Sequence, residues 1–253
     1  MPRPVSAEKR RSSATPLYLI LGAVALAGIG LVATQLKPAK AAGASDFVPV
    51  TLTPEQLQRV PGISVGRSDA PIAIYEFADY QCPACGQWAT FIEPVIKERL
   101  VDTGKARYVF YDFPLGGTHQ YAFLAARAGR CANEQNKFWE FHDALFARQR
   151  DWSYAKNIGD AAEKFSEYAE TAGVDDGAFE QCLASDKYAK EVSETRKLGE
   201  TLGVQGTPTI FVNGQRITDL PGSYSEFEAQ VRRIAPQAFG DAPVAEAPAA
   251  GAP

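Results

Sequence analysis

The chain has 253 residues, of which 45% are hydrophobic and 22% are charged, the balance of an ordinary globular protein of one or two domains. Residues 1–45 carry six basic side chains and one acid, whereas residues 46–253 carry 20 basic and 29 acidic side chains. Proteins that bind nucleic acids depend on clustered lysine and arginine. Because residues 46–253 are acidic, we expect no nucleic-acid partner.

The N-terminal segment has the pattern of a membrane-targeting sequence. An uncharged run of 17 residues, Leu17 to Ala33, follows the basic cluster Lys9-Arg10-Arg11. This run is long for a signal peptide and just long enough for a transmembrane helix. Small residues at 39–44 offer cleavage sites, but the length favours an uncleaved anchor in the cytoplasmic membrane over a soluble periplasmic or secreted protein. In both cases residues 46–253 lie on the extracytoplasmic side.

The first half of the chain predicts a parallel βαβ unit. Residues 1–45 comprise the basic tip, the anchor or signal, and the start of a linker that runs over 34–50; a short helix at 54–60 and a loop follow. Residues 71–77, "PIAIYEF", are rich in β-branched and aromatic residues and predict a strand. Apolar residues at helical spacing predict a helix over 83–101, kinked or split at Pro94. A second strand is predicted at 106–111.

The second half predicts a helical insertion and then a ββα unit. Residues 114–203 have helical character throughout, with no strand signal of comparable strength. Strands are expected at 209–212 and 215–218, joined by Asn213-Gly214, the two-residue pattern of a type I′ hairpin. A final helix is expected over 223–234 with Ser223 as its N-cap, and the Ala/Pro-rich residues 237–253 are expected to be disordered.

The stretch "FADYQCPACGQW" places Cys82 and Cys85 between the first strand and the first helix. Unpaired N–H groups and the dipole at a helix N-terminus stabilise an anion, so a thiolate at Cys82 has a lowered pKa. Pro83 suits the first helical turn, and Cys85 lies one turn later, close enough to form or release a disulfide. The pattern indicates thiol–disulfide exchange.

A metal site and an inert disulfide are the alternatives. The pair supplies half a tetrahedral zinc site, and the further ligands are missing at the required spacing, because His119 and His142 are 23 positions apart. A structural bridge across so short a loop stabilises a protein little. We therefore expect no metal and no bound cofactor, since the disulfide is itself the redox group.

The motifs "FADYQCPAC" and "GVQGTPTIFVNG", with the βαβ–insertion–ββα order, resemble the DsbA-like branch of the thioredoxin superfamily over about residues 70–235. This resemblance implies an α/β thioredoxin fold with a central helical insertion, in a domain spanning 46–236. It implies that Cys82 is the exposed nucleophile and that Cys85 is the buried resolving thiol. It also implies that Pro208 is a cis-proline beside the active-site disulfide.

The resemblance implies further roles near the cysteines. The backbone of Thr207 would pair with the substrate chain as an added strand, and Glu76, six positions before the nucleophile, would relay a proton to Cys85. The alternative for Glu76 is a surface carboxylate on an edge strand. Tyr80 and Gln81 directly precede Cys82, so we expect both to border the substrate surface, with the insertion helices forming the other wall of the groove.

The chain departs from the strongly oxidising members of the family between the two cysteines. Those members have Pro-His, whereas this chain has Pro83-Ala84. Ala84 offers no donor or positive charge to the Cys82 thiolate, so we expect a less depressed pKa and a less oxidising disulfide. The chemistry is unchanged, but the direction of electron flow stays open.

The remaining cysteines, Cys131 and Cys182, lie in predicted helices of the insertion. In an exported protein such a pair is expected to form a structural disulfide, and related proteins often carry one there. A second redox relay and two free buried thiols are the alternatives. His119 either flanks the active-site groove or is a locally satisfied histidine at a helix start.

We interpret the chain as an exported, membrane-anchored thiol:disulfide oxidoreductase that oxidises thiols of exported proteins. The resemblance implies reoxidation by a quinone-linked membrane partner, DsbB-like or VKOR-like. A reductase or isomerase is the nearest alternative, but 46–70 is too short for a dimerisation domain, so a monomer is expected. A redox-silent module that binds a peptide or copper is the alternative from another class, although the chain's only methionine is Met1.

Overall fold

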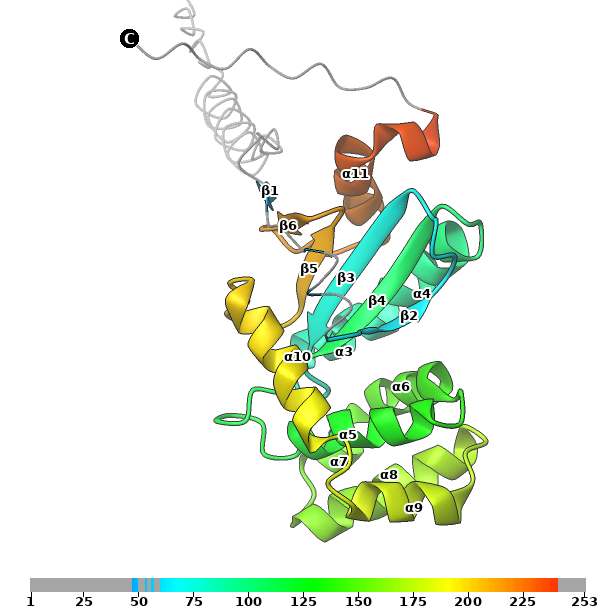
Figure 1. The fold of residues 1–253 in the computed structure, drawn as a ribbon, viewed down its shortest axis with the longest axis vertical. Coiled ribbons are helices and arrows are strands. Elements are labelled where there is room, and N and C mark those ends of the chain that lie inside the picture. The colour runs from blue at the N-terminus through cyan, green and yellow to red at the C-terminus, as the bar shows by residue number, and fades with distance from the viewer. Residues whose placement is uncertain (1–46, 50–52, 54–55, 57–59, 241–253) are drawn as a thin grey trace, which may run out of the picture. The chain divides into compact units, whose positions relative to one another are not determined.

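The computed structural model describes residues 47–49, 53, 56 and 60–240 (Figure 1). The predicted anchor at Leu17 to Ala33 lies outside these residues, as does most of the short helix predicted at 54–60. Within the described part of the chain, every helix is too short or too polar to cross a membrane.

Six strands form a mixed sheet with the order β1-β6-β5-β3-β4-β2. The strands are β1 (Phe47–Pro49), β2 (Ile63–Val65), β3 (Ile72–Ala78), β4 (Ala106–Asp112), β5 (Thr209–Val212) and β6 (Gln215–Ile217). The central strands β3 and β4 are parallel, and β5 pairs antiparallel with β3. The predicted thioredoxin arrangement, a βαβ unit followed by a ββα unit, is confirmed.

The two edge strands were not predicted. Strand β1 lies in the segment expected to be a linker, where Phe47 pairs with Ile217 of β6. Strand β2 lies in the segment expected to be a loop, where Ile63 pairs with Phe110 of β4. Each strand has three residues, too few for an alternating pattern to stand out, and each pairs with a strand that is distant in the sequence.

Alternate residues of the central strand pack on opposite faces of the sheet. Ile72 and Ile74 belong to a core formed with α3 (Pro83–Phe91), the helices that follow it, and α11 (Tyr224–Ile234). Tyr75 and Phe77 belong to a second core, formed with the α10 helix (Ala189–Thr201). The sheet is thus covered on both faces, and β3 is buried between them (Figure 1).

The helix predicted over 83–101 is interrupted, as expected from its internal proline. Helix α3 ends at Phe91, and α4 (Glu93–Ile96) begins with Pro94 in its first turn. The chain continues as the π-helix η2 (Lys97–Val101), in which Asp102 N–H donates to Lys97 O. The π-helical end was not predicted, because the apolar spacing of the sequence does not distinguish it from an α-helix.

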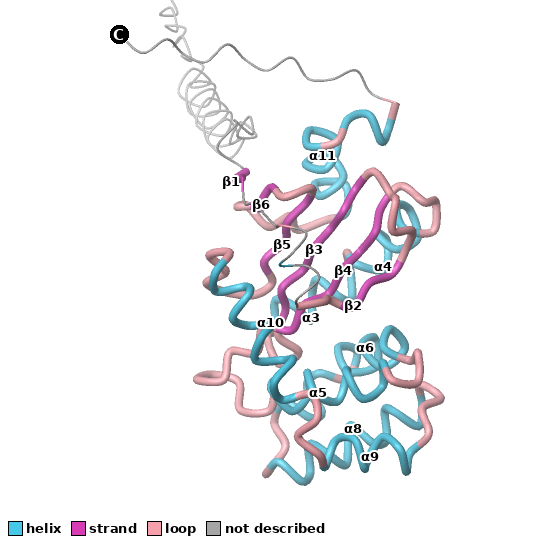
Figure 2. The backbone as a smooth tube through the Cα atoms, viewed as in Figure 1, coloured by secondary structure: helices cyan, strands magenta, loops and turns pink. Residues whose placement is uncertain are grey.

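The insertion is entirely helical, as predicted. Its helices are α5 (Ala122–Asn133), α6 (Phe138–Ala147), α7 (Gln149–Ser153), α8 (Ile158–Thr171), α9 (Asp176–Ala184) and α10. Helices α5 to α9 lie beyond the end of the sheet, and α10 runs back toward it (Figure 2). Buried aromatic side chains fill this bundle, among them Phe141, Trp152 and Phe165.

The C-terminal unit follows the predicted hairpin and helix. Asn213 and Gly214 both have positive φ, 47° and 76°, as a type I′ turn requires. Ser223 caps α11 by accepting a hydrogen bond from Glu226 N–H. The 3-10 helix η3 (Pro236–Phe239) extends ordered structure past the predicted start of the disordered tail, and residues 241–253 lie outside the described part.

Candidate active site

Cys82 and Cys85 lie at the start of α3, after the short turn that follows β3. Cys82 is the N-cap of α3 and Pro83 its first residue, so the Cys82 side chain faces the unpaired N–H groups of the first turn. Both cysteines are free thiols. Cys85 is fully buried, and Cys82 is only 8% exposed, more enclosed than the exposed nucleophile that the resemblance implied.

The surroundings of Cys82 stabilise its thiolate. A hydrogen bond with the Cys85 thiol, and further bonds from the backbone of Cys85 and Ala84, lower the pKa of Cys82 from 9.0 to about 5, against the opposing effect of burial. The predicted lack of a donor side chain at Ala84 is thus offset by neighbouring groups. At neutral pH Cys82 is a thiolate, the form that attacks disulfides.

Cys85 has the opposite environment. Burial, together with its hydrogen bond to Cys82 and the negative charge there, raises the pKa of Cys85 well above its ordinary value. Its sulfur accepts a hydrogen bond from Asp79 N–H at 3.5 Å. The two thiols thus differ in their readiness to ionise, which assigns attack to Cys82 and leaves Cys85 protonated until a proton acceptor is engaged.

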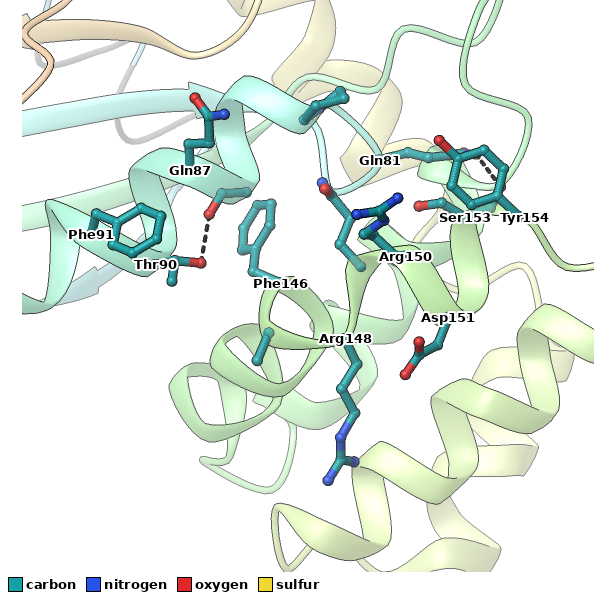
Figure 3. A pocket seen from close by; sticks show the side chains of 14 residues that line it. Gln81, Gln87, Thr90, Phe91, Phe146, Arg148, Arg150, Asp151, Ser153 and Tyr154 are labelled. Atoms are coloured by element: carbon teal, nitrogen blue, oxygen red, sulfur yellow. Dashed lines mark hydrogen bonds between the residues drawn. The ribbon is translucent and has the colours of Figure 1, made fainter.

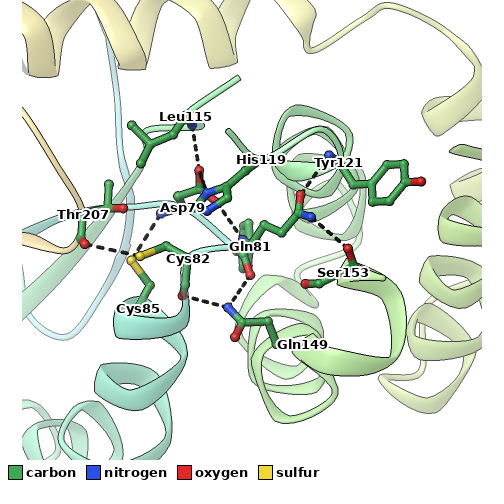
Figure 4. A network of polar contacts seen from close by, with 11 residues as sticks. Asp79, Gln81, Cys82, Cys85, Leu115, His119, Tyr121, Gln149, Ser153 and Thr207 are labelled. Carbon is green, nitrogen blue, oxygen red and sulfur yellow. Dashed lines mark hydrogen bonds and ion pairs between the residues drawn. The ribbon is translucent and has the colours of Figure 1, made fainter. Parts of the chain in front are cut away.

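The Thr207–Pro208 peptide bond is cis, as the resemblance implied, and it lies directly before β5. Cys82 Sγ lies 3.3 Å from Thr207 O, to which it donates a hydrogen bond when it is protonated (Figure 4). Segments that are 125 positions apart in the sequence therefore meet at the nucleophile. The Thr207 backbone lies beside the sulfur that exchanges, in a place where it can contact a bound chain.

Glu76 is buried at the centre of the sheet, so the alternative of a surface carboxylate on an edge strand is wrong. It pairs with Phe110 of β4 on one side and Ile210 of β5 on the other. Its Oε2 accepts a hydrogen bond from Tyr108 Oη at 2.5 Å, and that hydroxyl accepts one from Trp88 Nε1. Burial, reinforced by a nearby buried carboxylate, raises the pKa of Glu76 well above its ordinary value.

The prediction that Tyr80 borders the substrate surface is wrong. Tyr80 is 1% exposed, and its hydroxyl contacts His142 Nδ1 at 3.1 Å inside the helical insertion. Gln81 is half-buried and lies between the sheet and the helical insertion. Its Nε2 donates to Ser153 O, and its Oε1 accepts from Tyr121 N–H.

Two residues that the sequence did not single out organise the active-site loop (Figure 4). Asp79 is buried and accepts hydrogen bonds from Gln81 N–H, Leu115 N–H and His119 Nδ1. Gln149 reaches from the insertion and donates to two backbone carbonyls of the loop, those of Tyr80 and Cys82, each at 2.8 Å. These contacts fix the backbone that carries the nucleophile.

His119 is largely buried and satisfied by Asp79, its ring nitrogen lying 2.9 Å from the carboxylate. It therefore contacts the active-site loop through Asp79, and both of its predicted descriptions hold in part. No pattern in the sequence signals Gln149, because its partners lie 69 and 67 positions away. Asp79 is part of the motif around Cys82, but its contacts are with Leu115 and His119, which only the fold brings near it.

The predicted disulfide between Cys131 and Cys182 is present and joins α5 to α9, with an S–S distance of 2.01 Å. Among the described residues, the atoms of Glu93, His142 and Asp143 lie within 4.8 Å of one another and could in principle hold a metal ion. Lys97 Nζ lies 2.8 Å from Glu93 and 3.4 Å from Asp143, so an ammonium group already supplies the cation there.

The fold of this chain is also found in known proteins. The family model described as Thioredoxin matches residues 58–233, more than half of the chain. The chain belongs to the thioredoxin family. The crystal structure of BdbD from Bacillus subtilis, in its oxidised form, superposes with a TM-score of 0.62 and 25% identity, over 74% of this chain and 97% of that one. The predicted resemblance to the DsbA-like branch is confirmed.

Relatives in sequence fall into two kinds. The "Na(+)/H(+) antiporter NhaA 3" of Salinispora tropica is 38% identical over 151 residues, which are 60% of this chain but 21% of that protein. The chain therefore spans about a fifth of the length of that relative. The "Probable disulfide bond formation protein D" of Bacillus cereus is 33% identical over 158 residues, which are 60% of this chain and 69% of that protein.

Proposed function

We propose that the chain is a protein thiol:disulfide oxidoreductase that exchanges disulfides through Cys82 and Cys85. The observation that carries this proposal is the pairing of a stabilised thiolate with a buried, protonated thiol one helical turn away. A low pKa makes Cys82 both an attacking group at neutral pH and a good leaving group. The names of the relatives that match over most of their length support the same activity.

In the oxidising direction, the Cys82–Cys85 disulfide is attacked at Cys82 by a substrate thiolate. The bond between the two cysteines breaks, a mixed disulfide forms between Cys82 and the substrate, and Cys85 leaves as a thiolate that takes up a proton. A second substrate thiolate then attacks the substrate sulfur and releases Cys82 as a thiolate. The substrate loses two electrons and two protons, and the enzyme pair is reduced.

Glu76 is the proposed proton relay for Cys85. It is buried on the strand that precedes the cysteines, and its raised pKa brings it closer to that of the thiol with which it would exchange a proton. The substrate chain is proposed to pair with the backbone of Thr207 beside Pro208. Gln81, which is half-exposed at the groove next to Cys82, is proposed to contact the substrate from the other side.

The oxidising direction is favoured because a stabilised Cys82 thiolate stabilises the reduced pair, and this makes the disulfide a stronger oxidant. We place the domain on the extracytoplasmic side of a membrane, held by the apolar segment at 17–33. Its substrates are thiols of exported proteins, and a quinone-linked membrane protein is proposed to reoxidise it. We expect a monomer.

The reduction potential of the pair in the full chain, measured by equilibration with glutathione, tests the direction. A value near about −120 mV would place the protein with donors of disulfides, and a value near about −270 mV would make it a reductase. A chain in which Cys82 and Cys85 never equilibrate with glutathione would contradict the exchange activity itself, and would favour a redox-silent binding module.

A further inference from the structure

A groove of about 690 Å³ runs beside the active site, between α3 and the segment 146–154 of the insertion (Figure 3). It begins at Gln81 and Pro83, the neighbours of the nucleophile, and extends along the whole length of α3 to Phe91. Thr207 and Pro208 do not line it. The groove is therefore distinct from the strand-pairing edge at Thr207.

One face of α3 forms the first wall. The residues that line the groove recur at helical spacing: Pro83, Gly86, Gln87, Thr90 and Phe91. Eight residues of α-helix rise about 12 Å, which an extended chain covers in about four residues at 3.3 Å each. A polypeptide that leaves the Cys82 sulfur along this face would therefore bring its fourth residue to Phe91.

Exposed aromatic side chains mark the ends of the groove. Phe91 is 70% exposed and Tyr154 is 79% exposed, and both line the groove. They belong to a short set of large hydrophobic side chains that are exposed on the described surface. Half of that set thus lines one groove, where apolar side chains of a bound segment would cover them.

The insertion contributes a positive charge to the second wall. Arg150 lines the groove and extends toward Gln81, whereas Arg148 and Asp151 point toward the neighbouring helices (Figure 3). Arg148 lies over the ring of Tyr168 at 5.0 Å. Among the described residues, none forms a hydrogen bond, ion pair or ring contact with Arg150. This unpaired guanidinium belongs to residues 46–253, which carry 29 acidic and 20 basic side chains.

The floor of the groove also holds an unused polar group. Ser153 Oγ is buried and has no hydrogen-bond partner among the described residues. Gln149 lies closely against α3, because a Cβ added to Gly86 would come within 2.7 Å of Gln149 Oε1. The absence of a side chain at Gly86 thus lets the insertion approach α3 and set the width of the groove.

We propose that this groove binds the substrate segment that flanks the reactive cysteine, and that it selects a carboxylate within one or two residues of that cysteine and an apolar side chain near the fourth. The occupant is a polypeptide because Cys82, next to the groove, bonds to the cysteine of one. Arg150 supplies the charge complementarity, and Phe91 supplies the apolar contact. This inference rests on the proposed exchange activity.

The test uses the reduced full chain and short peptides whose single cysteine carries a chromogenic aromatic thiol in a mixed disulfide. Cys82 attacks the peptide sulfur, the original S–S bond breaks, a Cys82–peptide disulfide forms, and the aromatic thiolate leaves and is measured. Matched peptides carry Glu, Gln or Lys next to the cysteine. Each rate is divided by the rate with the small symmetrical disulfide of the same aromatic thiol, which removes any change in the reactivity of Cys82.

We expect the Glu peptide to react about two- to five-fold faster than the Gln peptide, the range set by exposed ion pairs, and the Lys peptide to react more slowly. About 1 M salt should abolish the difference. Arg150→Gln should also abolish it, and Arg148→Gln, which makes the same charge change beside it, should preserve it. An unchanged Glu/Gln ratio in Arg150→Gln would overturn the proposal, as would an equal loss in Arg148→Gln.

A second pair of peptides tests the apolar contact. A peptide with Leu at the fourth position should react a few-fold faster than one with Ser, and Phe91→Ser should remove that gain. Phe91 is 70% exposed, so the variant is expected to fold. Equal rates for the Leu and Ser peptides would overturn this part. If neither the peptides nor the small disulfide react, the exchange activity itself fails; if all react equally, the groove proposal fails and the activity stands.

Discussion

The protein contains two pairs of cysteines that differ in almost every physical respect. Cys82 and Cys85 are three positions apart at the start of a helix, and both are free thiols. Cys131 and Cys182 are 51 positions apart in two helices of the insertion, and they are joined in a disulfide. A link across a long loop restricts the unfolded chain far more than a link across a short one.

The difference between the pairs follows from what surrounds each sulfur. Cys82 has helical N–H groups and a thiol donor that stabilise its anion, so its disulfide opens readily. Cys131 is buried in the core of the insertion and is bonded to Cys182. We therefore assign exchange to the first pair and stability to the second. The predictions below test that assignment.

The largest expected effect is that of Cys82→Ser. A serine hydroxyl does not ionise near neutral pH, so the rate of disulfide exchange with a reduced, unfolded substrate protein should fall to that of the uncatalysed reaction. Cys85→Ser, given a substrate protein that already contains a disulfide, should still allow the Cys82 thiolate to attack that disulfide. The mixed disulfide should then accumulate because Cys85 is absent, and non-reducing electrophoresis detects it. Appreciable exchange by Cys82→Ser would mean that another group is the nucleophile.

Removal of the second pair should have the opposite signature. The double variant Cys131→Ala/Cys182→Ala is expected to lose about 2–4 kcal/mol of unfolding free energy, because its unfolded chain is no longer cross-linked. Its exchange rate, measured well below its melting temperature, should equal that of the parent. Chemical denaturation measures the first quantity. A loss of exchange in the folded variant would instead support the second redox relay that the sequence left open.

A smaller effect is expected from Glu76→Gln. The variant keeps a polar group for Tyr108 but removes the proton acceptor near Cys85, so we expect the step that needs Cys85 as a thiolate to slow by about ten-fold. The exposed Glu140→Gln is the matched control and should leave the rate unchanged. An unaltered rate and pH profile in Glu76→Gln would exclude Glu76 as the relay.

The same variant has a predicted effect on stability. The pKa of Glu76 is raised in the folded protein, so its contribution is fully present below its ordinary pKa of 4.5 and is lost as the pH rises through the folded value. Glu76→Gln lacks this loss. Relative to the parent, its unfolding free energy should therefore increase with pH above about 4.5.

Features of the fold that depend on residues close together in the chain could be predicted from the sequence. The βαβ–insertion–ββα order, the break at Pro94 and the Asn213-Gly214 turn were predictable, because each depends on residues close together in the chain. The motif around Cys82 was predictable for the same reason. The three-residue edge strands were not, since their hydrogen-bond partners lie in distant strands.

The inward turn of Tyr80 and the contacts of Gln149 were beyond the sequence for a related reason. Gln149 donates to a loop 67 positions away, across the boundary between the insertion and the sheet. Only the packing of the insertion against the sheet brings Gln149 and this loop together. The same limit applied to Glu76, whose neighbours on both sides are strands that the sequence could name but not place in order.

The smallest expected change is in the titration of Cys82. Because the hydrogen bond from Cys85 is the largest cause of its low pKa, Cys85→Ala should raise the pKa of Cys82 above the parent's value of about 5. Ultraviolet absorbance of the thiolate follows the titration, with Cys131–Cys182 intact as an internal control that does not titrate.

The stability of the reduced protein should follow the same titration. The pKa of Cys82 is lower in the folded protein than its ordinary value of 9.0, so the thiolate's contribution is present above pH 9.0 and is lost as the pH falls through about 5. Between these values the unfolding free energy of the reduced parent should decline with acidity more steeply than that of Cys85→Ala. The Cys82–Cys85 disulfide form carries no thiolate, so its stability should lack this dependence. If oxidised and reduced forms declined alike, the low pKa of Cys82 could not support the oxidising direction that we propose.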